Sequence, residues 1–556
     1  MPNNKDYNKV DVLVVGAGPA GLSAAIQIKK SKPEFDVCVI DKAFGPGNHN
    51  LSGAVLEHEP FLSLMDYAAD GWRDSKKGKD LLNRKIKTEK IPFMPSRKIS
   101  FDLLFALKIA KWLGLGLGTM LHKGDYTVSI SKLSKFMAIT ARDIGVEVFY
   151  GFAARDILFD EETGLTRGVK LIDQGFDREG NRQPNYIPGD TINADFIILA
   201  EGCEGLLTEK FIEKANLERE HPQLFSLGVK ELIRVTPEQY KKFTPNRVVH
   251  TLGFPIWKPF IGPAMFGGGI IYPGAEDHIA VGMIVGADWK YYDFNPQDAL
   301  TRFKEHKYVK KFTEGGTVVE AGAKLIPEGG LRAIPREAET GSIGKGNCVI
   351  TGDSAGFVNM LKIRGIHLAI DSGIQAATAI IDKAAKPLET ASKYTELIDK
   401  GRVGKEMRSA ENYRQTIAKF GPTLGIPLSV ISNILPEFTA EEDYRAMKET
   451  KYRLKPERDF DKDAFTAAAA TEHREDQPCH LEIIDPDICQ QKCDPSFSRP
   501  CITFCPAGVY EVVGGKAKAA NPSNCLHCKT CQRKCPFDNI NWTVPEGSGG
   551  PRYKKM

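Results

Sequence analysis

The stretch "NCLHCKTCQRKCP", residues 524–536, is the feature that most constrains how this chain can fold. Its four cysteines are separated by two, two and three residues, and a proline follows the last of them. Thiolates at these spacings let a short loop wrap one cubane iron-sulfur cluster, whereas structural zinc is usually held by two separated C-x2-C elements. The run therefore favours a 4Fe-4S site over a zinc site.

The cysteine before proline directs attention to a second segment. In two-cluster ferredoxins, the cysteine in this position ligates the other cluster of the pair, so the first three cysteines need a ligand from elsewhere. The segment "FCPAG" offers Cys505, which also precedes a proline. We therefore expect one 4Fe-4S cluster to be held by Cys505, Cys525, Cys528 and Cys531.

The distribution of the cysteines indicates the compartment. Nine of the 12 cysteines lie between Cys479 and Cys535, and the other three (Cys38, Cys203 and Cys348) are scattered in apolar surroundings. A secreted disulfide scaffold would spread its cysteines more evenly. The asymmetry favours a reducing compartment and a local metal site.

The opening segment "VDVLVVGAGPAGLSAA" predicts a strand, a glycine turn and a helix, and "FDVCVID" predicts the next strand. Gly16 permits the tight turn, Gly18 lets the backbone approach a pyrophosphate, and Gly21 allows close helix packing. Asp41 ends the second strand, where it can accept hydrogen bonds from a ribose. This βαβ unit predicts dinucleotide binding, with FAD and NAD both open at this step.

A later motif narrows the choice of cofactor. The segment "TGDSAG" puts Asp353 at the end of an apolar strand, where it can reach the ribityl chain of a flavin or cap a helix. No second GxGxxG follows the first, so no obvious NAD(P)H site is visible. Together the motifs favour FAD, and we assign no catalytic general acid or base.

Charge and hydropathy exclude some functions and leave the membrane question open. The net charge is +4 over 556 residues, and no long basic block with interleaved aromatics suggests nucleic-acid binding. No apolar run reaches about 18 residues, and no export signal is expected. Two shorter apolar segments, residues 101–121 and 422–435, are each either a membrane-surface contact or a core element.

The motifs taken in order resemble the electron transfer flavoprotein-ubiquinone oxidoreductase family. The resemblance covers nearly the whole chain, and the motifs that carry it are "VVGAGPAGLSAAIQIK", "NLSGAVLE", "AVGMIVGADW", "GDSAGFVNMLKIRGIHLAIDSGIQAA", "CPAGVYE", "NCLHCKTC" and "NINWTVPEGSGGP". It implies an enzyme with one FAD, one 4Fe-4S cluster and a quinone site. It further implies electrons from a reduced electron transfer flavoprotein, and a monotopic protein on the inner (cytoplasmic) membrane that faces a reducing compartment.

The resemblance also implies the cluster ligands and the architecture. The family's ligands carry over onto the same four cysteines, Cys505, Cys525, Cys528 and Cys531. The expected fold class is α/β, with a discontinuous Rossmann-like FAD-binding domain, an inserted α+β quinone-site domain and a C-terminal ferredoxin-like domain. The first part of the FAD-binding domain is expected at 1–215, with a membrane-contact insertion at about 95–125, and its return segment at 335–385. The quinone-site domain is expected between them at 216–334. A helical segment at 386–470 and a linker at 464–478 are expected to lead into the iron-sulfur domain at 471–556.

One departure from the family leaves alternatives open. Family members lack Cys489, Cys493 and Cys501, and they have no cysteine at the position of Cys535. These four cysteines either bind a second cluster, although spacings of three and seven residues are unusual, or are free thiols or a small metal clip. The alternative functions are a fused Fix-type flavoprotein/ferredoxin subunit, a flavin-dependent isoprenoid reductase and a non-catalytic electron carrier.

Overall fold

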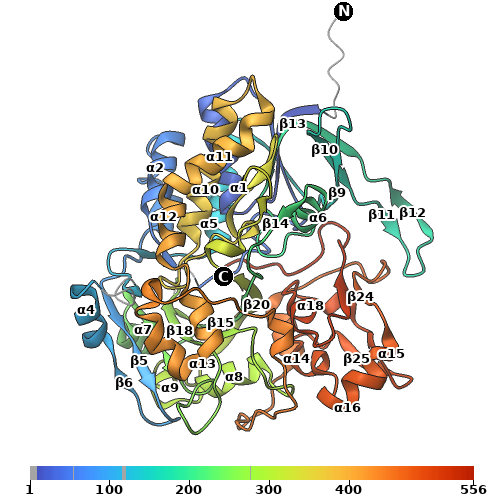
Figure 1. Ribbon diagram of the computed structural model, residues 1–556. Helices are drawn as coiled ribbons and strands as arrows, with labels where there is room; N and C mark the ends of the chain where they lie inside the picture. The colour runs from blue at the N-terminus through green and yellow to red at the C-terminus, as the bar shows by residue number, and fades with distance from the viewer. Residues whose placement is uncertain (1–8, 54, 115–119, 276) are drawn as a thin grey trace, which may run out of the picture.

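A mostly parallel sheet assembled from distant parts of the chain forms the first layer of the molecule. The computed structural model describes residues 9–53, 55–114, 120–275 and 277–556 (Figure 1). The strand order is β22-β23-β13-β1-β2-β8, and β10 and β9 extend from β13 as an antiparallel branch. The strands are β1 Lys9–Val15, β2 Val37–Asp41, β8 Glu147–Tyr150, β9 Ala154–Phe159, β10 Thr166–Leu171, β13 Thr191–Leu199, β22 Gly344–Lys345 and β23 Cys348–Ile350. The predicted discontinuous sheet is confirmed.

Apolar helices cover this sheet because their small and aliphatic side chains pack closely. Helix α1 (Pro19–Ser31) lies against α10 (Ile366–Asp382) and α5 (Ile130–Asp143). Gly373 of α10 lies so close that an added Cβ would sit 2.1 Å from the Ala20 carbonyl oxygen. The further helices around this layer are α2 Glu59–Ala68, α3 Lys76–Leu81, α6 Leu206–Lys214, α11 Thr390–Lys400 and α12 Arg402–Ser409.

A second sheet is built mainly from the chain between β13 and β22. It is antiparallel through β20-β15-β19-β18-β16, and β4 joins β16 in parallel. The strands are β4 Thr88–Lys90, β15 Phe225–Arg234, β16 Arg247–His250, β18 Gly267–Pro273, β19 His278–Gly286 and β20 Thr317–Pro327, with helices α7 Pro237–Phe243, α8 Pro296–Lys304 and α9 Lys307–Thr313. The neighbouring strands β15 and β19 pair from Ser226 with Gly286 to Arg234 with His278.

An outlying β-hairpin precedes an exposed apolar helix. Strands β5 (Pro92–Met94) and β6 (Phe101–Asp102) pair with each other, and β5 also pairs with β17 (Leu252–Gly253). Helix α4 (Leu104–Trp112) follows β6 and has no buried residue. Figure 1 shows α4 and this hairpin at the edge of the molecule.

The helical segment continues in α13 (Tyr413–Ser429), which is kinked at Gly421, where φ is +69°. The chain then passes through 3-10 turns at Ser432–Ile434 and Asp443–Ala446 to α14 (Lys462–Ala469). Helix α14 packs on β20. The stretch 464–478, predicted as a linker, therefore begins as a packed helix, because Phe465 and Ala469 bury their apolar side chains.

The cysteine-rich end folds as short helices around two antiparallel strand pairs, β24–β27 and the hairpin β25–β26. Its elements are β24 Leu481–Ile483, α15 Pro486–Ile488, a π-helical turn Cys489–Cys493, α16 Asp494–Phe497, α17 Pro500–Phe504, β25 Tyr510–Val513, β26 Lys516–Ala519, α18 Thr530–Lys534 and β27 Ile540–Trp542. Figure 1 shows this domain beside β20 and below the first layer.

The C-terminal tail returns from this domain to the first layer. The Ser548 amide donates to the Lys42 carbonyl oxygen at 2.8 Å, and the Tyr553 amide donates to the Asn48 carbonyl oxygen at 3.0 Å. The carbonyl oxygen of the buried Met556 accepts from the Ser131 amide at 3.1 Å. The tail thus joins the cysteine-rich domain to helix α5.

Candidate functional site

A large cavity opens at the carboxyl ends of β1, β2, β13 and β23, where the first sheet meets the second. Residues from both sheets, from α10 and from the cysteine-rich domain line it. Such a position at the strand ends of an open α/β sheet is where this type of fold binds ligands. Gly16, Gly18, Asp41 and Asp353 all lie in its wall.

The three predicted glycines have different physical roles. Gly16 has a φ of +111°, and a Cβ there would lie 2.2 Å from the Ala200 carbonyl oxygen. A Cβ on Gly21 would lie 2.0 Å from the Gly16 carbonyl oxygen, so these two positions are required by packing. A Cβ on Gly18 would have no neighbour closer than 3.7 Å. Of these three glycines, only Gly18 therefore has room for a side chain.

The start of α1 offers an anion site beside Gly18. Gly18 is the N-cap of α1, and no side chain caps the helix. Pro19 occupies the first turn, as is common where a free N–H is not needed. The uncapped amides and the helix dipole favour a negatively charged group at this end, such as a pyrophosphate.

The two predicted acidic residues lie at strand ends on opposite sides of this turn. The Asp41 carboxylate accepts hydrogen bonds from the amides of Ala17 and Ala43, each at 2.8 Å. Asp353 follows β23, and burial raises its pKa to about 6, an effect that nearby Lys324 partly offsets. Asp41 therefore braces the glycine turn as well as bordering the cavity, while Asp353 is a buried acid in its wall.

Several basic residues of the cavity were not predicted from the sequence. Lys42, His49, Lys324 and Lys529 all line it. Burial, Lys529 and Lys324 together lower the pKa of Lys42 to about 7. Lys42 follows Asp41 directly and could have been noticed, whereas the others come from distant segments and carry no local signal. This concentration of buried positive charge fits an anionic cofactor such as FAD.

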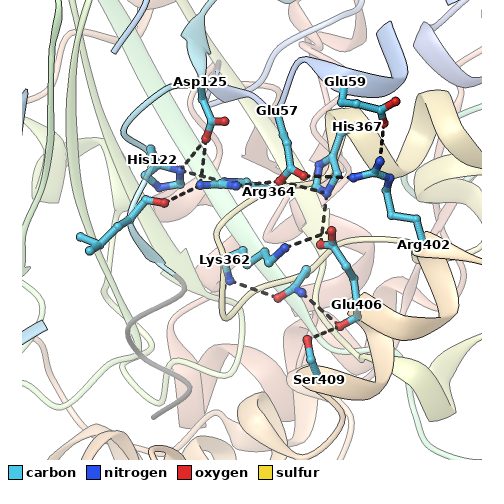
Figure 2. Close-up of polar contacts among 12 residues, drawn as sticks. Glu57, Glu59, His122, Asp125, Lys362, Arg364, His367, Arg402, Glu406 and Ser409 are labelled. Carbon is cyan, nitrogen blue, oxygen red and sulfur yellow. Dashed lines mark hydrogen bonds and ion pairs between the residues drawn. The ribbon is translucent and has the colours of Figure 1, made fainter. Parts of the chain in front are cut away.

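Helix α10 presents a second uncapped N-terminus to the cavity. Gly365 is its N-cap, no side chain caps it, and Gly365 and Ile366 both line the cavity. The preceding Arg364 is held by a polar network (Figure 2). Its guanidinium donates to Glu57 at 2.7 Å and to the Leu121 carbonyl oxygen at 2.6 Å. The network fixes the start of α10 against the chain segments that carry Glu57 and Leu121.

The network continues along the helices behind Arg364. Glu406 accepts from His367 at 3.1 Å and pairs with Lys362 at 3.0 Å, and these contacts lower the pKa of Glu406 to about 2 despite its partial burial. Arg402 pairs with Glu57 at 3.2 Å. Figure 2 shows these charges alternating in sign, which is how buried ionic groups avoid a large desolvation cost.

A buried chain of rings leads from this network to Tyr272 in the cavity wall. The Arg364 Nε donates to His122 Nδ1 at 2.8 Å, and the His122 and His250 rings lie 4.8 Å apart. His250 Nε2 lies 2.5 Å from the Tyr272 hydroxyl. Burial lowers the pKa of both histidines, so both are neutral near pH 7. Neutral His250 therefore positions the Tyr272 hydroxyl, and burial raises the pKa of Tyr272, so this hydroxyl keeps its proton near pH 7.

The four predicted cluster ligands, Cys505, Cys525, Cys528 and Cys531, line one small cavity in the cysteine-rich domain. Lys529 also lines this cavity and the large one, so the two cavities are adjacent. The Thr530 hydroxyl donates to the Cys528 sulfur at 3.4 Å. Buried thiolates of this number fit a 4Fe-4S cluster. A separate cavity is lined by Cys489, Cys493, Cys501 and Cys535.

Exposed apolar side chains gather where the outlying hairpin meets α13. Trp112 of α4 is 84% exposed and Phe260 is 88% exposed. Phe93 of β5 packs against Trp257, with ring centroids 5.6 Å apart, and the Trp257 indole donates to Thr423 of α13 at 3.0 Å. We call the exposed residues the apolar face: Phe101, Phe105, Ile109, Trp112, Leu113, Phe260, Ile261, Leu424, Ile431 and Ile434.

The two apolar segments predicted from the sequence both contribute to this face. Leu115 and Leu117, in the first segment, lie outside the described residues. Among the helices that the structure describes, none has the length and hydropathy needed to span a bilayer.

Comparison with known proteins gives consistent results along the chain. The family model described as "Electron transfer flavoprotein-ubiquinone oxidoreductase, 4Fe-4S" matches residues 457–554, and that described as "ETF-QO, ubiquinone-binding" matches residues 225–326. A third, the Thi4 family, matches residues 1–59. The cysteine-rich domain and the second sheet thus each correspond to a known module.

Whole-chain relatives share the same description. The electron transfer flavoprotein-ubiquinone oxidoreductase of Pseudomonas aeruginosa is 34% identical over 99% of this chain and 100% of its own length. The mitochondrial protein of that name from Homo sapiens is 32% identical over 99% of this chain and 89% of its own.

A solved structure resembles most of this chain in fold. A geranylgeranyl bacteriochlorophyll reductase-like protein from Thermoplasma acidophilum has a TM-score of 0.55 at 20% identity, and covers 78% of this chain and 94% of its own. That likeness supports the fold alone.

Proposed function

The chain belongs to the electron transfer flavoprotein-ubiquinone oxidoreductase family, and from that premise we propose how its residues serve electron transfer to a membrane quinone. The observation that carries the proposal is the adjacency of the two cavities, which share Lys529. We propose that Cys505, Cys525, Cys528 and Cys531 hold the 4Fe-4S cluster, with the FAD beside it. The domain divisions expected from the sequence are part of this proposal.

Gly16, Gly18, Gly21, Asp41 and Asp353 would bind the FAD, which can exchange one or two electrons with its neighbours. The free space at Gly18 and the uncapped start of α1 support a pyrophosphate at that position. The uncapped start of α10 would stabilise negative charge on a reduced flavin ring. Lys42 and Lys324 would balance the charge of the bound cofactor.

Reduction of a quinone requires two electrons and two protons, and Tyr272 is suited to supply a proton. Its hydroxyl borders the large cavity and bonds to His250, behind which His122 lies. Tyr272→Phe should lower the rate of quinone reduction about tenfold, since a positioned proton donor contributes at least that much. Reduction of the flavin by the donor protein should be unchanged, and the surface variant Tyr67→Phe serves as control. An unchanged quinone rate would remove Tyr272 from this role.

The apolar face would dock on a membrane and let a hydrophobic quinone enter. Trp112 and the lysines of α4 are arranged as in interfacial helices, which insert apolar residues and keep cations at the headgroups. The double variant Phe105→Glu/Trp112→Glu should no longer sediment with phospholipid vesicles. The control Ile187→Glu, at an exposed isoleucine on β12 (Arg182–Ile187), should bind as the wild type does.

High salt should release little wild-type protein from the vesicles, because apolar insertion is not screened as ionic contacts are. Wild-type protein that stays in the supernatant would contradict docking by this face. The membrane expected for this protein is the inner (cytoplasmic) one, with the molecule facing a reducing compartment.

The function is tested by anaerobic stopped-flow with a purified, reduced electron transfer flavoprotein and a soluble quinone analogue. We expect rapid oxidation of the donor and reduction of the quinone in a two-electron stoichiometry. Failure to oxidise the donor would reject the proposed partner, and quinone reduction without the cluster would reject the proposed route. Ubiquinone and menaquinone analogues assayed in parallel distinguish the natural acceptor.

A further inference from the structure

Four cysteines outside the proposed cluster gather around a second small cavity. Cys489, Cys493, Cys501 and Cys535 all line it and are all buried. None of the four forms a disulfide in the described structure. From the observations below we propose that this cavity holds a second 4Fe-4S cluster, which no family assignment of this chain includes.

Each of two similar short helices carries one cysteine that lines one cavity and is followed by a cysteine that lines the other. Cys501 lies in α17 and Cys531 in α18, and each faces one cavity, while Cys505 and Cys535, which follow the helices, face the opposite cavity. The amide of Cys505 bonds to the Cys501 carbonyl oxygen at 3.2 Å, and that of Cys535 bonds to the Cys531 carbonyl oxygen at 3.1 Å. This crossed arrangement is the one that two-cluster ferredoxins use.

The sulfurs of the second cavity accept hydrogen bonds as those of the first do. Cys535 accepts from the amides of Phe537 and Asn539, and Cys505 accepts in the same way from residues two and four positions ahead, Ala507 and Val509. The Asn539 side chain also donates to the Cys489 sulfur at 3.4 Å. Such donors stabilise metal-bound thiolates.

A half-buried cation adds to this environment. Arg499 lines the second cavity with its Nε buried and without a hydrogen-bond partner among the described residues, while its terminal nitrogen pairs with Asp494 at 2.9 Å. A positive charge beside the cavity favours an anionic occupant, and a 4Fe-4S cluster with four thiolate ligands is negatively charged.

The unusual cysteine spacing has a structural explanation. The π-helical turn Cys489–Cys493 brings its two terminal cysteines to the cavity. Of the seven residues that follow, the first four form α16, which has no buried residue, Ser498 and Arg499 both have φ of +52°, and Pro500 begins α17. The chain therefore returns with Cys501 at the cavity, and the long spacing does not separate the ligands.

The separation of the sulfurs opposes a zinc site. Four sulfurs bound to one zinc ion at about 2.3 Å would all lie within about 4 Å of one another. Among the described residues, no three cysteine sulfurs lie within 4.8 Å of one another. A cubane fits this wider spread because four iron atoms separate its ligands.

The first site adjoins the FAD cavity, and the second does not. The first site shares Lys529 with that cavity, whereas the second shares no lining residue with it. On the proposed function, the second cluster would take one electron at a time from the reduced flavoprotein donor. It would be oxidised by one electron as the first cluster is reduced by one, and no proton or further reactant is needed.

Iron and sulfide analysis of full-length protein purified without oxygen tests the proposal. We expect about eight irons and eight sulfides per chain, and an EPR spectrum of the reduced protein with two interacting spins. About four irons in the wild type, or zinc in the second site, would overturn the proposal. This measurement needs no variant and does not depend on the identity of the donor or the quinone.

Matched variants assign the clusters to their sites. Cys493→Ser should retain about four irons and the FAD, and its EPR spectrum should show a single non-interacting spin. The mirror variant Cys528→Ser should lose the other cluster, and the control Cys479→Ser, at an exposed cysteine, should keep about eight irons. Eight irons in Cys493→Ser would also overturn the assignment, whereas electron transfer failing with eight irons present would reject only the proposed function.

Discussion

The large cavity and the cysteine-rich domain are built in opposite ways. The cavity is bordered by residues from segments as distant as Gly16, Tyr272 and Lys529. The cysteine sites use side chains from one continuous stretch between Cys489 and Cys535. A site that depends on the whole fold is sensitive to backbone geometry, and a site made by one stretch is sensitive to single ligands. Each can therefore be removed while the other is kept.

The largest expected effect is loss of FAD from Gly18→Val. The fold has room for the new side chain, since a Cβ there meets nothing within 3.7 Å, but the side chain would occupy the space of the pyrophosphate. We expect flavin-free protein with a full iron content, measured by absorbance and iron analysis. Replacement of Gly16 or Gly21 should instead prevent folding, because each Cβ would clash with a backbone oxygen.

Normal flavin content in soluble Gly18→Val would contradict the assignment of this turn to the cofactor. Loss of iron together with flavin would show that the two sites cannot be removed independently.

Cys528→Ser should give the converse result. We expect the FAD to remain and electron transfer from the donor protein to the quinone to fall at least about 100-fold, because a required redox centre is lost. The checks are flavin absorbance, iron content and steady-state turnover. Turnover that survives with the cluster absent would place the cluster outside the route.

The affinity of the large cavity for FAD should depend on pH. Burial and the neighbouring lysines lower the pKa of Lys42 to about 7, well below that of an exposed lysine, and binding of an anionic pyrophosphate favours the protonated amine. Above pH 7, binding must take up a proton, so FAD affinity should fall by up to about tenfold per pH unit. Titration of the apoprotein with FAD between pH 7 and 9 measures this effect.

Lys42→Met should weaken FAD binding at pH 7 and flatten the pH dependence. Lys210→Met, at a lysine near the surface, should leave both unchanged. A pH dependence of the same slope in Lys42→Met would assign the proton to another group.

The smallest expected effect concerns the boundary between the large cavity and the first cysteine site. Lys529 is buried between them, and its ammonium lies 5.2 Å from the centroid of the Trp542 ring, which borders the first cysteine site. Lys529→Met should lower the reduction potentials of both the FAD and the first cluster by roughly tens of millivolts, because a positive charge favours the reduced forms. Lys529→Arg should restore them, and spectroelectrochemical titration follows both centres. A shift in one centre alone would show that the regions are electrostatically separate.

The sequence predicted the parts of the site that depend on local geometry. Gly16, Gly18 and Gly21 are detectable because a strand, a turn and a helix follow each other directly, and Cys505 is detectable through its proline. Lys324 and Lys529 were missed because tertiary folding alone brings them to the cavity. Tyr272 was missed for the same reason, since its partner His250 lies on the neighbouring strand β16.

The second cysteine site was left open because spacing describes distance along the chain. Only the fold shows that the residues between Cys493 and Cys501 form an outward turn. The predicted FAD and 4Fe-4S cofactors and the predicted fold class are confirmed by the family and the structure, whereas the individual ligands stay predictions.

The C-terminal tail has a consequence for the mechanics of the molecule. The cysteine-rich domain is held at its beginning by α14 on β20 and at its end by the tail that reaches Ser131. A domain anchored at both ends has no hinge about which to swing, unlike redox domains that shuttle between partners on a single tether. The spacing between the electron carriers is therefore set by the fold, and the transfer rate between them should not depend on solvent viscosity.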